Sequence, residues 1–408
     1  MPFKIDHYPD SLKALNAQIS AARAAFPNTR ATRIAQILTE GGMRLDLERA
    51  HNLGIVEAYR KAGVVRNPDD PMEYDSPNTG GGAASDDPAH PLPDGEQWNE
   101  GRRKTLTGVS YELDEKGRPI NPYMNTGLRG RGMMWLYGPN HCVDNGVLQI
   151  SPDENGTPTL YIVGIRRKDD PQQRPAMSGG FAKFRKTPDG GYVLDEDAIL
   201  ETRLEEFFEE MISDSVPLLP EYEARIEKEY ADAIARTTAR PGTVLTEEHK
   251  EEIKEQVVTA LKLQQVRDLD PGFLDRLREF LSHGRECFAG PVISTGRATN
   301  NSWIESRQNW VLLEHDRWRG IVGNGRFNYQ LSGGDDSAGV HHFPVTPETI
   351  RTALPSHGPM MTFMLASFLL DRQEKGIELH PNIMRQLEDL ADFYSPAPGA
   401  QPSGPAPR

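Results

Sequence analysis

Residues 195–210, DEDAILETRLEEFFEE, decide the fold that we predict for this chain. The stretch holds eight acidic residues in sixteen positions and one basic residue, Arg203. Its apolar residues recur at a helical spacing and share one face: Leu200, Leu204, Phe207, Phe208 and Met211. At about 100° per residue, Glu206, Glu209 and Glu210 fall on the opposite side. Like charges four residues apart destabilise a helix by about 0.2–0.5 kcal/mol per pair, so the clustering of glutamates needs an explanation. Two interpretations are open. The helix either presents a solvated acidic face or holds a hard divalent cation such as Mg²⁺.

Composition restricts the class of protein. The 408 residues suffice for two or three domains, and a net charge of −14 argues against nonspecific binding to nucleic acid or anionic membranes. Cys142 and Cys287 form neither a disulfide framework nor a zinc motif. The longest apolar run, residues 360–370, is too short for a membrane span and predicts a buried core helix. Since no secretory or mitochondrial signal is recognisable, we expect a cytoplasmic protein, although export by a specialised machine would leave no such signature.

Local composition predicts the outer segments of the chain. Residues 1–66 show helical spacing of apolar side chains, with a second helix over about residues 30–38. Residues 67–95 are rich in Pro, Gly, Asp and Ser and predict a flexible linker. The Pro- and Ala-rich residues 395–408 predict a disordered tail.

The central part of the chain mixes strand and helix signals. Short β-rich runs occupy residues 160–165 and 310–313, and residues 187–191, TPDGG, predict a hairpin tip. Residues 219–283 are mostly helical, and Thr246 followed by two glutamates is a helix-start signal. Strands that alternate with long helices predict an α/β or α+β domain.

The acidic stretch resembles the Nudix box, G-x5-E-x7-R-E-U-x-E-E-x-G-U, in which U is aliphatic. Placing the paired glutamates on Glu209 and Glu210 puts Glu206 on the glutamate of the R-E pair and Asp197 on the earlier glutamate. We prefer Gly180 for the first glycine. That choice makes the loop before Asp197 sixteen residues long, where the family has five.

Several positions depart from the Nudix pattern. Gly191 competes with Gly180 because it has the family's spacing to Asp197, whereas Gly180 has the family's strand context. Glu205 replaces the box arginine, and residues 212–213, Ile-Ser, replace the final Gly-aliphatic pair. In the family that arginine orients the glutamates, so its absence implies a lower metal affinity or rate unless a neighbour such as Arg203 substitutes.

Flanking segments resemble one Nudix branch, that of the animal mitochondrial ADP-ribose pyrophosphatase and the homologous C-terminal domain of the ADP-ribose-gated melastatin-type cation channel. The resemblance covers most of residues 110–370. Its segments are 111–113 YEL, 117–119 GRP, 121–122 NP, 126–132 TGLRGRG, 138–141 GPNH, 165–169 IRRKD, 297–305 RATNNSWIE, 334–339 GDDSAG and 356–357 SH.

The resemblance implies a Nudix fold, a mixed β-sheet sandwiched between helices, preceded by an N-terminal helical region. It divides the chain into an N-terminal lobe at 96–140 and a Nudix hydrolase domain at 141–394. A helical insertion at 214–283 interrupts that domain.

The resemblance also implies a reaction, the cleavage of the pyrophosphate of ADP-ribose to AMP and ribose 5-phosphate. Mg²⁺, with Mn²⁺ as an alternative, would be held by the three box glutamates with Gly180 and Asp197. Asp335 and Asp336 are candidates for a general base, and the alternative for them is an ordinary turn.

Candidate substrate-binding residues come from three of the matching segments. The arginine-rich run 165–169 offers phosphate-binding groups, with a solvated strand end as the alternative. The run 297–305 offers amides and a ring for ribose and base, although the ring is as well suited to a core position. The residues are Arg129, Arg131, Arg166, Arg167, Asn300, Asn301 and Trp303. We expect His141 to be a structural histidine.

Three functions therefore compete. The first is a Mg²⁺-dependent ADP-ribose hydrolase, which the retained glutamates favour. The second is a catalytically weak or inactive sensor that binds ADP-ribose, which the missing arginine favours. The third is a hydrolase of a related nucleoside diphosphate derivative or another diphosphate. No sequence feature predicts the oligomeric state.

Overall fold

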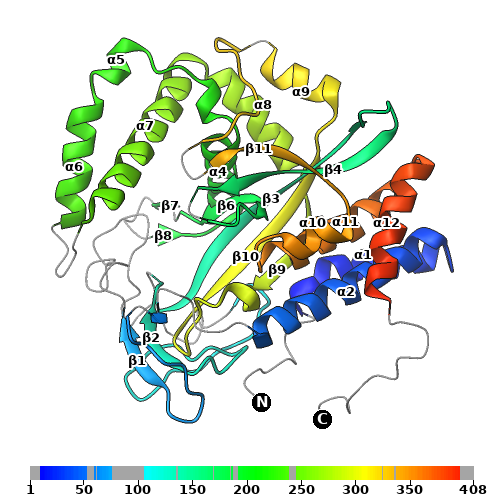
Figure 1. The fold of residues 1–408 in the computed structure, drawn as a ribbon, viewed down its shortest axis with the longest axis horizontal. Coiled ribbons are helices and arrows are strands. Elements are labelled where there is room, and N and C mark those ends of the chain that lie inside the picture. Colours follow the sequence, from blue (N-terminus) through cyan, green and yellow to red (C-terminus); the bar gives the residue numbers. More distant parts are fainter. Residues whose placement is uncertain are drawn as a thin grey trace.

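A mixed β-sheet between two layers of helices forms the centre of the computed structural model (Figure 1). This confirms the predicted fold class. The structure describes residues 10–52, 59–60, 62–75, 105–134, 137–168, 170–183, 185–186, 192–238, 245–323, 325–334 and 337–395.

Seven strands of the described chain make up this sheet. They are β3 Gly138–Pro152, β4 Pro158–Arg167, β5 Pro175–Ala176, β6 Ser178–Phe181, β9 Arg285–Pro291, β10 Ser302–Leu312 and β11 Ser337–Pro344. The main path runs β11-β4-β3-β10-β9, with β5 on β4 and β6 on β3. The pairing of β10 with β3 is parallel and the other pairings are antiparallel.

Strand alternation divides the apolar residues between two cores. Side chains of successive strand residues point to opposite faces of a sheet. On β3, Leu148 lies in the first core and Val147 in the second. On β4, Ile162 and Val163 divide in the same way. The sheet is therefore buried on both faces, and both helical layers are needed to cover it.

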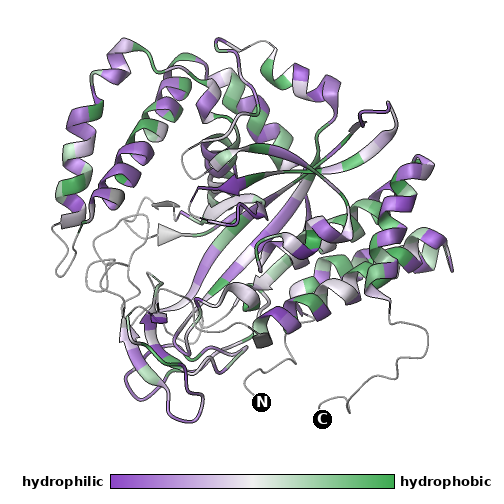
Figure 2. Ribbon diagram, viewed as in Figure 1, coloured by the Kyte–Doolittle hydropathy of each residue, from purple (hydrophilic) through white to green (hydrophobic). Residues whose placement is uncertain are grey.

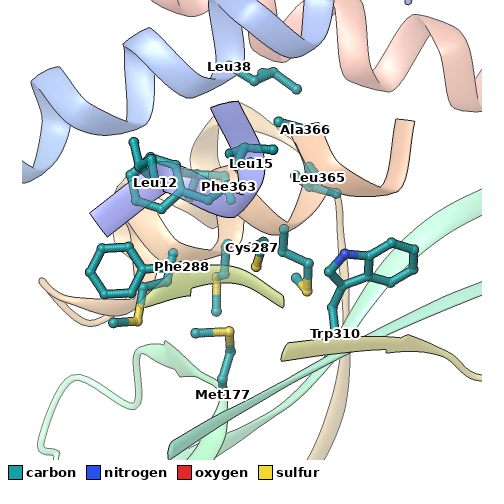
Figure 3. Packing of buried hydrophobic residues seen from close by; sticks show 14 of the residues in the cluster. Leu12, Leu15, Leu38, Met177, Cys287, Phe288, Trp310, Phe363, Leu365 and Ala366 are labelled. Carbon is teal, nitrogen blue, oxygen red and sulfur yellow. The ribbon is translucent and has the colours of Figure 1, made fainter. Parts of the chain in front are cut away.

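The first layer joins the two ends of the chain. Its helices are α1 Lys13–Ala25, α2 Arg30–Asn52, α10 Pro347–Thr352, α11 His357–Glu374 and α12 Pro381–Tyr394, with a short 3-10 turn at Ile293–Thr295. Figure 3 shows Leu12, Leu15 and Leu38 of the N-terminal part packed around Phe363 and Ala366 of α11. The N-terminal helices and α11 thus share one core, and α11 confirms the buried helix predicted over residues 360–370.

Helix α2 is longer than predicted. The predicted helix ends near residue 38, whereas α2 continues to Asn52 through Gly41 and Gly42. A Cβ atom built at Gly41 would meet the ring of Tyr394 at 2.2 Å, and one at Gly42 would meet Phe363 at 2.7 Å. Glycine disfavours a helix, which is why the sequence predicts an earlier end. The close packing that Gly41 and Gly42 permit stabilises the helix by more than the glycines cost.

The second layer holds the acidic helix and the insertion. Its helices are α4 Glu196–Met211, a 3-10 turn Ser213–Ser215, α5 Pro220–Glu223, α6 Ile226–Thr238, α7 Glu247–Leu269, α8 Pro271–Ser282 and α9 His315–Val322. Thr246 caps α7 by accepting a hydrogen bond from the His249 amide, which confirms the predicted helix start. Figure 2 colours long parts of α6 and α7 as hydrophilic, and no residue of α6 is buried.

Two small sheets complete the fold. Strand β1, Met72–Asp75, pairs in parallel with β2, Leu128–Gly132. The prediction of a flexible linker over residues 67–95 is therefore wrong for residues 72–75, where pairing with β2 orders the chain. Strands β7, Arg185–Lys186, and β8, Tyr192–Val193, pair antiparallel on either side of the predicted hairpin tip. That tip at 187–191, residues 76–95 of the predicted linker and residues 396–408 of the predicted tail lie outside the described residues. Within the described chain, no helix combines the length and the apolar character of a membrane span.

Candidate active site at the acidic helix

The acidic stretch forms helix α4, as predicted. Asp195 caps its N-terminus by accepting a hydrogen bond from the Ala198 amide at 2.9 Å. Glu196 and Asp197 lie in the first turn, where their negative charge interacts favourably with the helix dipole. The apolar side of α4 is buried in the second core; it comprises Leu204, Phe207, Phe208 and Met211. Packing of these side chains fixes the direction of the glutamates. Asp197 is exposed at the opposite end of the helix from the paired glutamates.

Two of the three box glutamates converge on the glycine pair of β6. The Gly179 amide donates a hydrogen bond to the Glu210 carboxylate at 2.8 Å. A Cβ atom built at Gly180 would lie 2.3 and 2.6 Å from the two carboxylate oxygens of Glu206. Such separations are too short for any side chain, so glycine is required at position 180 for Glu206 to sit there. The geometry therefore supports Gly180 as the box glycine; Gly191 lies outside the described residues.

Glu209 lies where the C-terminal half of α4 meets the loop before β11. Its carbonyl accepts a hydrogen bond from Ser213 Oγ at 2.8 Å, and a Cβ atom at Gly334 would lie 1.4 Å from the same carbonyl oxygen. Asp335 and Asp336 are outside the described residues. Of the residues that flank them, Gly334 contacts α4, and Ser337 pairs in register with Arg167.

The position of the missing arginine is part of a network of ion pairs. Glu205 Oε2 accepts from Lys183 Nζ at 2.8 Å and Glu205 Oε1 accepts from Arg267 at 2.5 Å. Burial alone would raise the pKa of the Glu205 carboxyl, but attraction and hydrogen bonds from Lys183 and Arg267 hold that pKa below its usual value. Glu205 is therefore ionised at neutral pH and bound on both of its oxygens.

The hypothesis that Arg203 substitutes for the box arginine is wrong. Arg203 is 4% exposed and donates from Nε to Asn145 Oδ1 at 3.1 Å and from a terminal nitrogen to the Leu281 carbonyl at 3.1 Å. Burial, with repulsion from Arg307, lowers its pKa to about 10. The side chain ties α4 to β3 and to the end of α8.

The oxygen-only donor set suits a hard divalent cation by chemistry. Two carboxylates, those of Glu206 and Glu210, lie against one dipeptide, Gly179-Gly180. Among the described residues, however, no group of three or more His, Cys, Asp and Glu side chains is arranged to hold a metal ion. The described residues therefore offer oxygen ligands of the kind that such an ion prefers, but fewer than three of these side chains are grouped around one point.

The predicted phosphate-binding arginines lie at the end of β4. Arg166 donates to the Gln173 carbonyl at 3.0 Å and stacks over the ring of Phe343 at 5.6 Å. Arg167 is half-buried beside the first residue of β11. These arginines and the flanks of the Asp335-Asp336 segment therefore lie at the same edge of the sheet.

A second group of predicted substrate residues lies together elsewhere. Arg129, Asn300 and Asn301 line a pocket of about 240 Å³ with Asp114. Asn301 donates to Asp114 Oδ2 at 3.1 Å and to a backbone carbonyl at 3.0 Å. Asn300 accepts from the Thr126 amide at 2.6 Å. Both amides thus connect loops of the protein in this structure.

The remaining predicted positions are buried. Trp303 is 1% exposed, donates from Nε1 to Glu305 at 2.8 Å and packs edge-on against Tyr111. Arg131 is 3% exposed, with its guanidinium over the Tyr137 ring at 5.4 Å. Burial, with repulsion from Arg307, lowers the pKa of His141 to about 4, which fits a neutral structural histidine.

Two contacts near the site could not be predicted from the sequence. Lys183 follows the glycine pair by three positions, and nothing local predicts its ion pair with Glu205. His357, at the start of α11, accepts a hydrogen bond from the Met177 amide at 2.8 Å and so braces the residue before β6. Both contacts join segments far apart in the chain.

Comparisons with known proteins place this site in context. No family model matches the chain. The mitochondrial ADP-ribose pyrophosphatase of Rattus norvegicus is 41% identical over 76 residues, 16% of this chain and 21% of that protein. The transient receptor potential cation channel subfamily M member-like 2 of Nematostella vectensis is 28% identical over 241 residues, 57% of this chain and 11% of that protein. These matches relate the chain to both proteins, and they span about a fifth or less of each relative.

A solved structure is also similar. It is a mutT/nudix family protein from Listeria innocua, 14% identical, covering 58% of this chain and 97% of that one with a TM-score of 0.24. Similarity at that level is too low to support an argument about the site.

Proposed function

We propose that this chain is a Mg²⁺-dependent Nudix hydrolase that cleaves the diphosphate of ADP-ribose to AMP and ribose 5-phosphate. The observation that carries the proposal is the convergence of Glu206 and Glu210 on the Gly179-Gly180 pair. The relationship to an ADP-ribose pyrophosphatase supports the choice of substrate. A cytoplasmic location stays part of the same proposal.

The residues that would hold Mg²⁺, or Mn²⁺ in its place, are Glu206, Glu209 and Glu210, with the Gly180 carbonyl. The predicted metal role of Asp197 is wrong, because Asp197 lies in the first turn of α4, about 18 Å along the helix axis from Glu209. When bound, the ion would neutralise charge on the diphosphate and lower the pKa of a water molecule. Asp335 or Asp336 would accept the proton of the attacking water. Because Gly179 holds Glu210 through its amide, the protein fixes this carboxylate before any ligand arrives.

The phosphate groups would be oriented by Arg166 and Arg167. Both arginines lie at the end of β4, and Arg167 pairs in register with Ser337, the residue that follows the Asp335-Asp336 pair in the sequence. Charge-assisted bonds from such guanidinium groups to phosphate oxygens are short and directional. Asn300, Asn301 and Trp303 would contact the ribose and base only through rearrangement, because they are hydrogen-bonded or buried here. Arg131, proposed for the diphosphate, is buried as well, whereas Arg129 is exposed.

A second candidate is a sensor that binds ADP-ribose without cleaving it. Two observations favour it: Glu205 stands where the family has arginine, and the longer of the two sequence matches is to a channel protein. A third candidate is a hydrolase of another nucleoside diphosphate derivative. The retained glutamates and their glycine cradle favour hydrolysis over sensing.

One assay separates these candidates. The protein is incubated with Mg²⁺ and, separately, ADP-ribose, NADH, a dinucleoside polyphosphate and an inositol pyrophosphate, and products are resolved by chromatography. The proposal expects AMP from ADP-ribose with the highest kcat/KM of the series. Tight ADP-ribose binding by calorimetry without AMP would support the sensor, and a higher kcat/KM for another diphosphate would replace the substrate.

A further inference from the structure

Lys183 is bound to the acidic helix at two points. Its backbone amide donates to Thr202 Oγ1 at 3.0 Å, and its ammonium donates to Glu205 Oε2 at 2.8 Å. Thr202 and Glu205 lie one helical turn before Glu206 and Glu209, respectively. The chain just after the glycine pair is therefore fixed along the side of α4 that carries the glutamates.

The Lys183 ammonium belongs to the electrostatic environment of the glutamate cluster. Burial opposes its charge, but attraction to Glu209, Glu205 and Glu206 outweighs burial and raises the pKa of Lys183. The group is thus a permanent cation. Its side chain is 43% exposed, so the ammonium keeps access to a ligand although it is already paired.

The helical insertion fixes the partner of Lys183. Arg267 of α7 binds the other oxygen of Glu205 and also Glu201 at 2.8 Å, and Arg278 of α8 binds Glu201. These contacts occupy Glu201 and Glu205, the two acidic residues of α4 that most closely precede the box glutamates. Glu205 is held on the insertion side by Arg267, and it therefore presents a fixed oxygen to Lys183.

We propose that Lys183 is a phosphate-binding residue of this site, with its ammonium placed by Glu205 and, through Glu205, by Arg267 of the insertion. This inference rests on the proposed diphosphate chemistry. A cation beside metal-binding carboxylates has opposite effects on two ligands. It repels a divalent metal ion and attracts the anionic diphosphate. A lysine that only stabilised the fold would affect both ligands in the same direction.

The test compares Lys183→Gln with wild-type protein for two ligands. Mn²⁺ binding is measured alone by electron paramagnetic resonance, and methylenediphosphonate, which cannot be hydrolysed, is measured by calorimetry at saturating Mg²⁺. We expect the variant to bind Mn²⁺ several-fold more tightly and the diphosphonate about tenfold more weakly. Lys183→Arg keeps the positive charge and is expected to restore most of the diphosphonate affinity.

The matched control is Lys250→Gln, which removes a lysine from a surface ion pair with Glu247 on α7. We expect wild-type affinities for both ligands. If Lys183→Gln does not fold by circular dichroism, Lys183→Ser is measured in its place. Weaker binding of both ligands, or no change in either, would overturn the inference. Failure of the wild type to produce AMP would instead overturn the proposed function, because the two affinity measurements need no turnover.

Discussion

The carboxylate of Glu206 lies against the α-carbon of Gly180, in the space that a Cβ atom at position 180 would fill. This contact joins the strand β6 to the acidic helix at the point where the two elements supply the candidate site. Glycine at this position therefore permits the close approach of Glu206 and serves no turn, since Gly180 has no positive φ angle.

Gly180→Ala should therefore displace Glu206. The added methyl group would lie 2.3 Å from a carboxylate oxygen and would force the carboxylate to move by roughly 1 Å, a misplacement that can reduce a rate by about 100-fold. We expect kcat for ADP-ribose to fall by roughly 10–100-fold with little change in melting temperature. Gly320→Ala is the control, because a Cβ atom there meets nothing within 4 Å. Equal activity of both variants would remove Glu206 from the site.

Glu210→Gln should separate metal binding from folding. The amide oxygen of glutamine can still accept the Gly179 hydrogen bond, so the fold is retained while the negative charge is lost. We expect Mn²⁺ affinity to fall by roughly 10–100-fold or more, as for perturbed metal sites in general. Turnover should fall with it. Glu251→Gln, an exposed position on α7, serves as the control. Unaltered Mn²⁺ binding would show that Glu210 is no ligand.

Arg203→Leu should destabilise the protein. The substitution leaves Asn145 Oδ1 without its donor in a buried environment, whereas the Leu281 carbonyl keeps the hydrogen bond from the Gly284 amide. An unsatisfied buried group costs about 1–3 kcal/mol, so we expect the free energy of unfolding to fall by about 1–3 kcal/mol. Urea denaturation measures this, with the exposed Arg236→Leu as control. If Arg203→Leu has wild-type stability but loses Mn²⁺ binding, Arg203 acts on the metal site after all.

Glu305 should make stability fall as pH rises. Burial raises the pKa of the Glu305 carboxyl to about 7, although hydrogen bonds from the Leu106 amide, Trp303 and Tyr123 act to lower that pKa. Between pH 4.5 and 7 the unfolded chain loses this proton first, so the contribution of Glu305 is complete below pH 4.5 and is lost as pH rises through 7.

The measurement compares wild type with Glu305→Gln by urea denaturation at several pH values. Relative to the variant, the wild type should lose about 2–3 kcal/mol between pH 4.5 and 7.5, since each pKa unit corresponds to about 1.36 kcal/mol. A difference between the two proteins that does not change with pH would contradict the buried, proton-binding state of Glu305.

Local patterns sufficed for much of the fold. The periodicity of Leu204, Phe207 and Phe208 predicts α4 and its buried face, and Thr246 predicts the start of α7. The mixed sheet between helices followed from the resemblance to a known family and is confirmed. The length of α2 was not predictable, because it depends on the rings of Tyr394 and Phe363 that accept Gly41 and Gly42 from the opposite end of the chain.

The sequence predicts which residue types the candidate site contains, but it does not predict the tertiary contacts between them. Spacing along one helix identifies Glu206 and Glu210, but their common target, the glycine pair, is a tertiary contact. Glu205 is paired with Lys183, which precedes α4 in the sequence, and with Arg267, which follows it. The spacing of residues along a helix does not predict which cation binds a given carboxylate. Arg203 is an example, because it hydrogen-bonds to Asn145 and to the Leu281 carbonyl and not to a glutamate of α4.

The shared core of the N-terminal helices and α11 has a consequence for synthesis. Helix α2 packs on α11, which lies more than 300 positions later in the chain. Strand β3 likewise gains its parallel neighbour in the sheet only when β10 has been made. On the ribosome, α1 and α2 therefore emerge with their apolar faces uncovered and stay so until α11, more than 300 residues later, has been made. Contacts of such high sequence separation form slowly and leave aggregation-prone surfaces exposed in the meantime. The nascent chain should depend on chaperones that recognise amphipathic helices, and truncation before α11 should leave α1 and α2 without a place to dock.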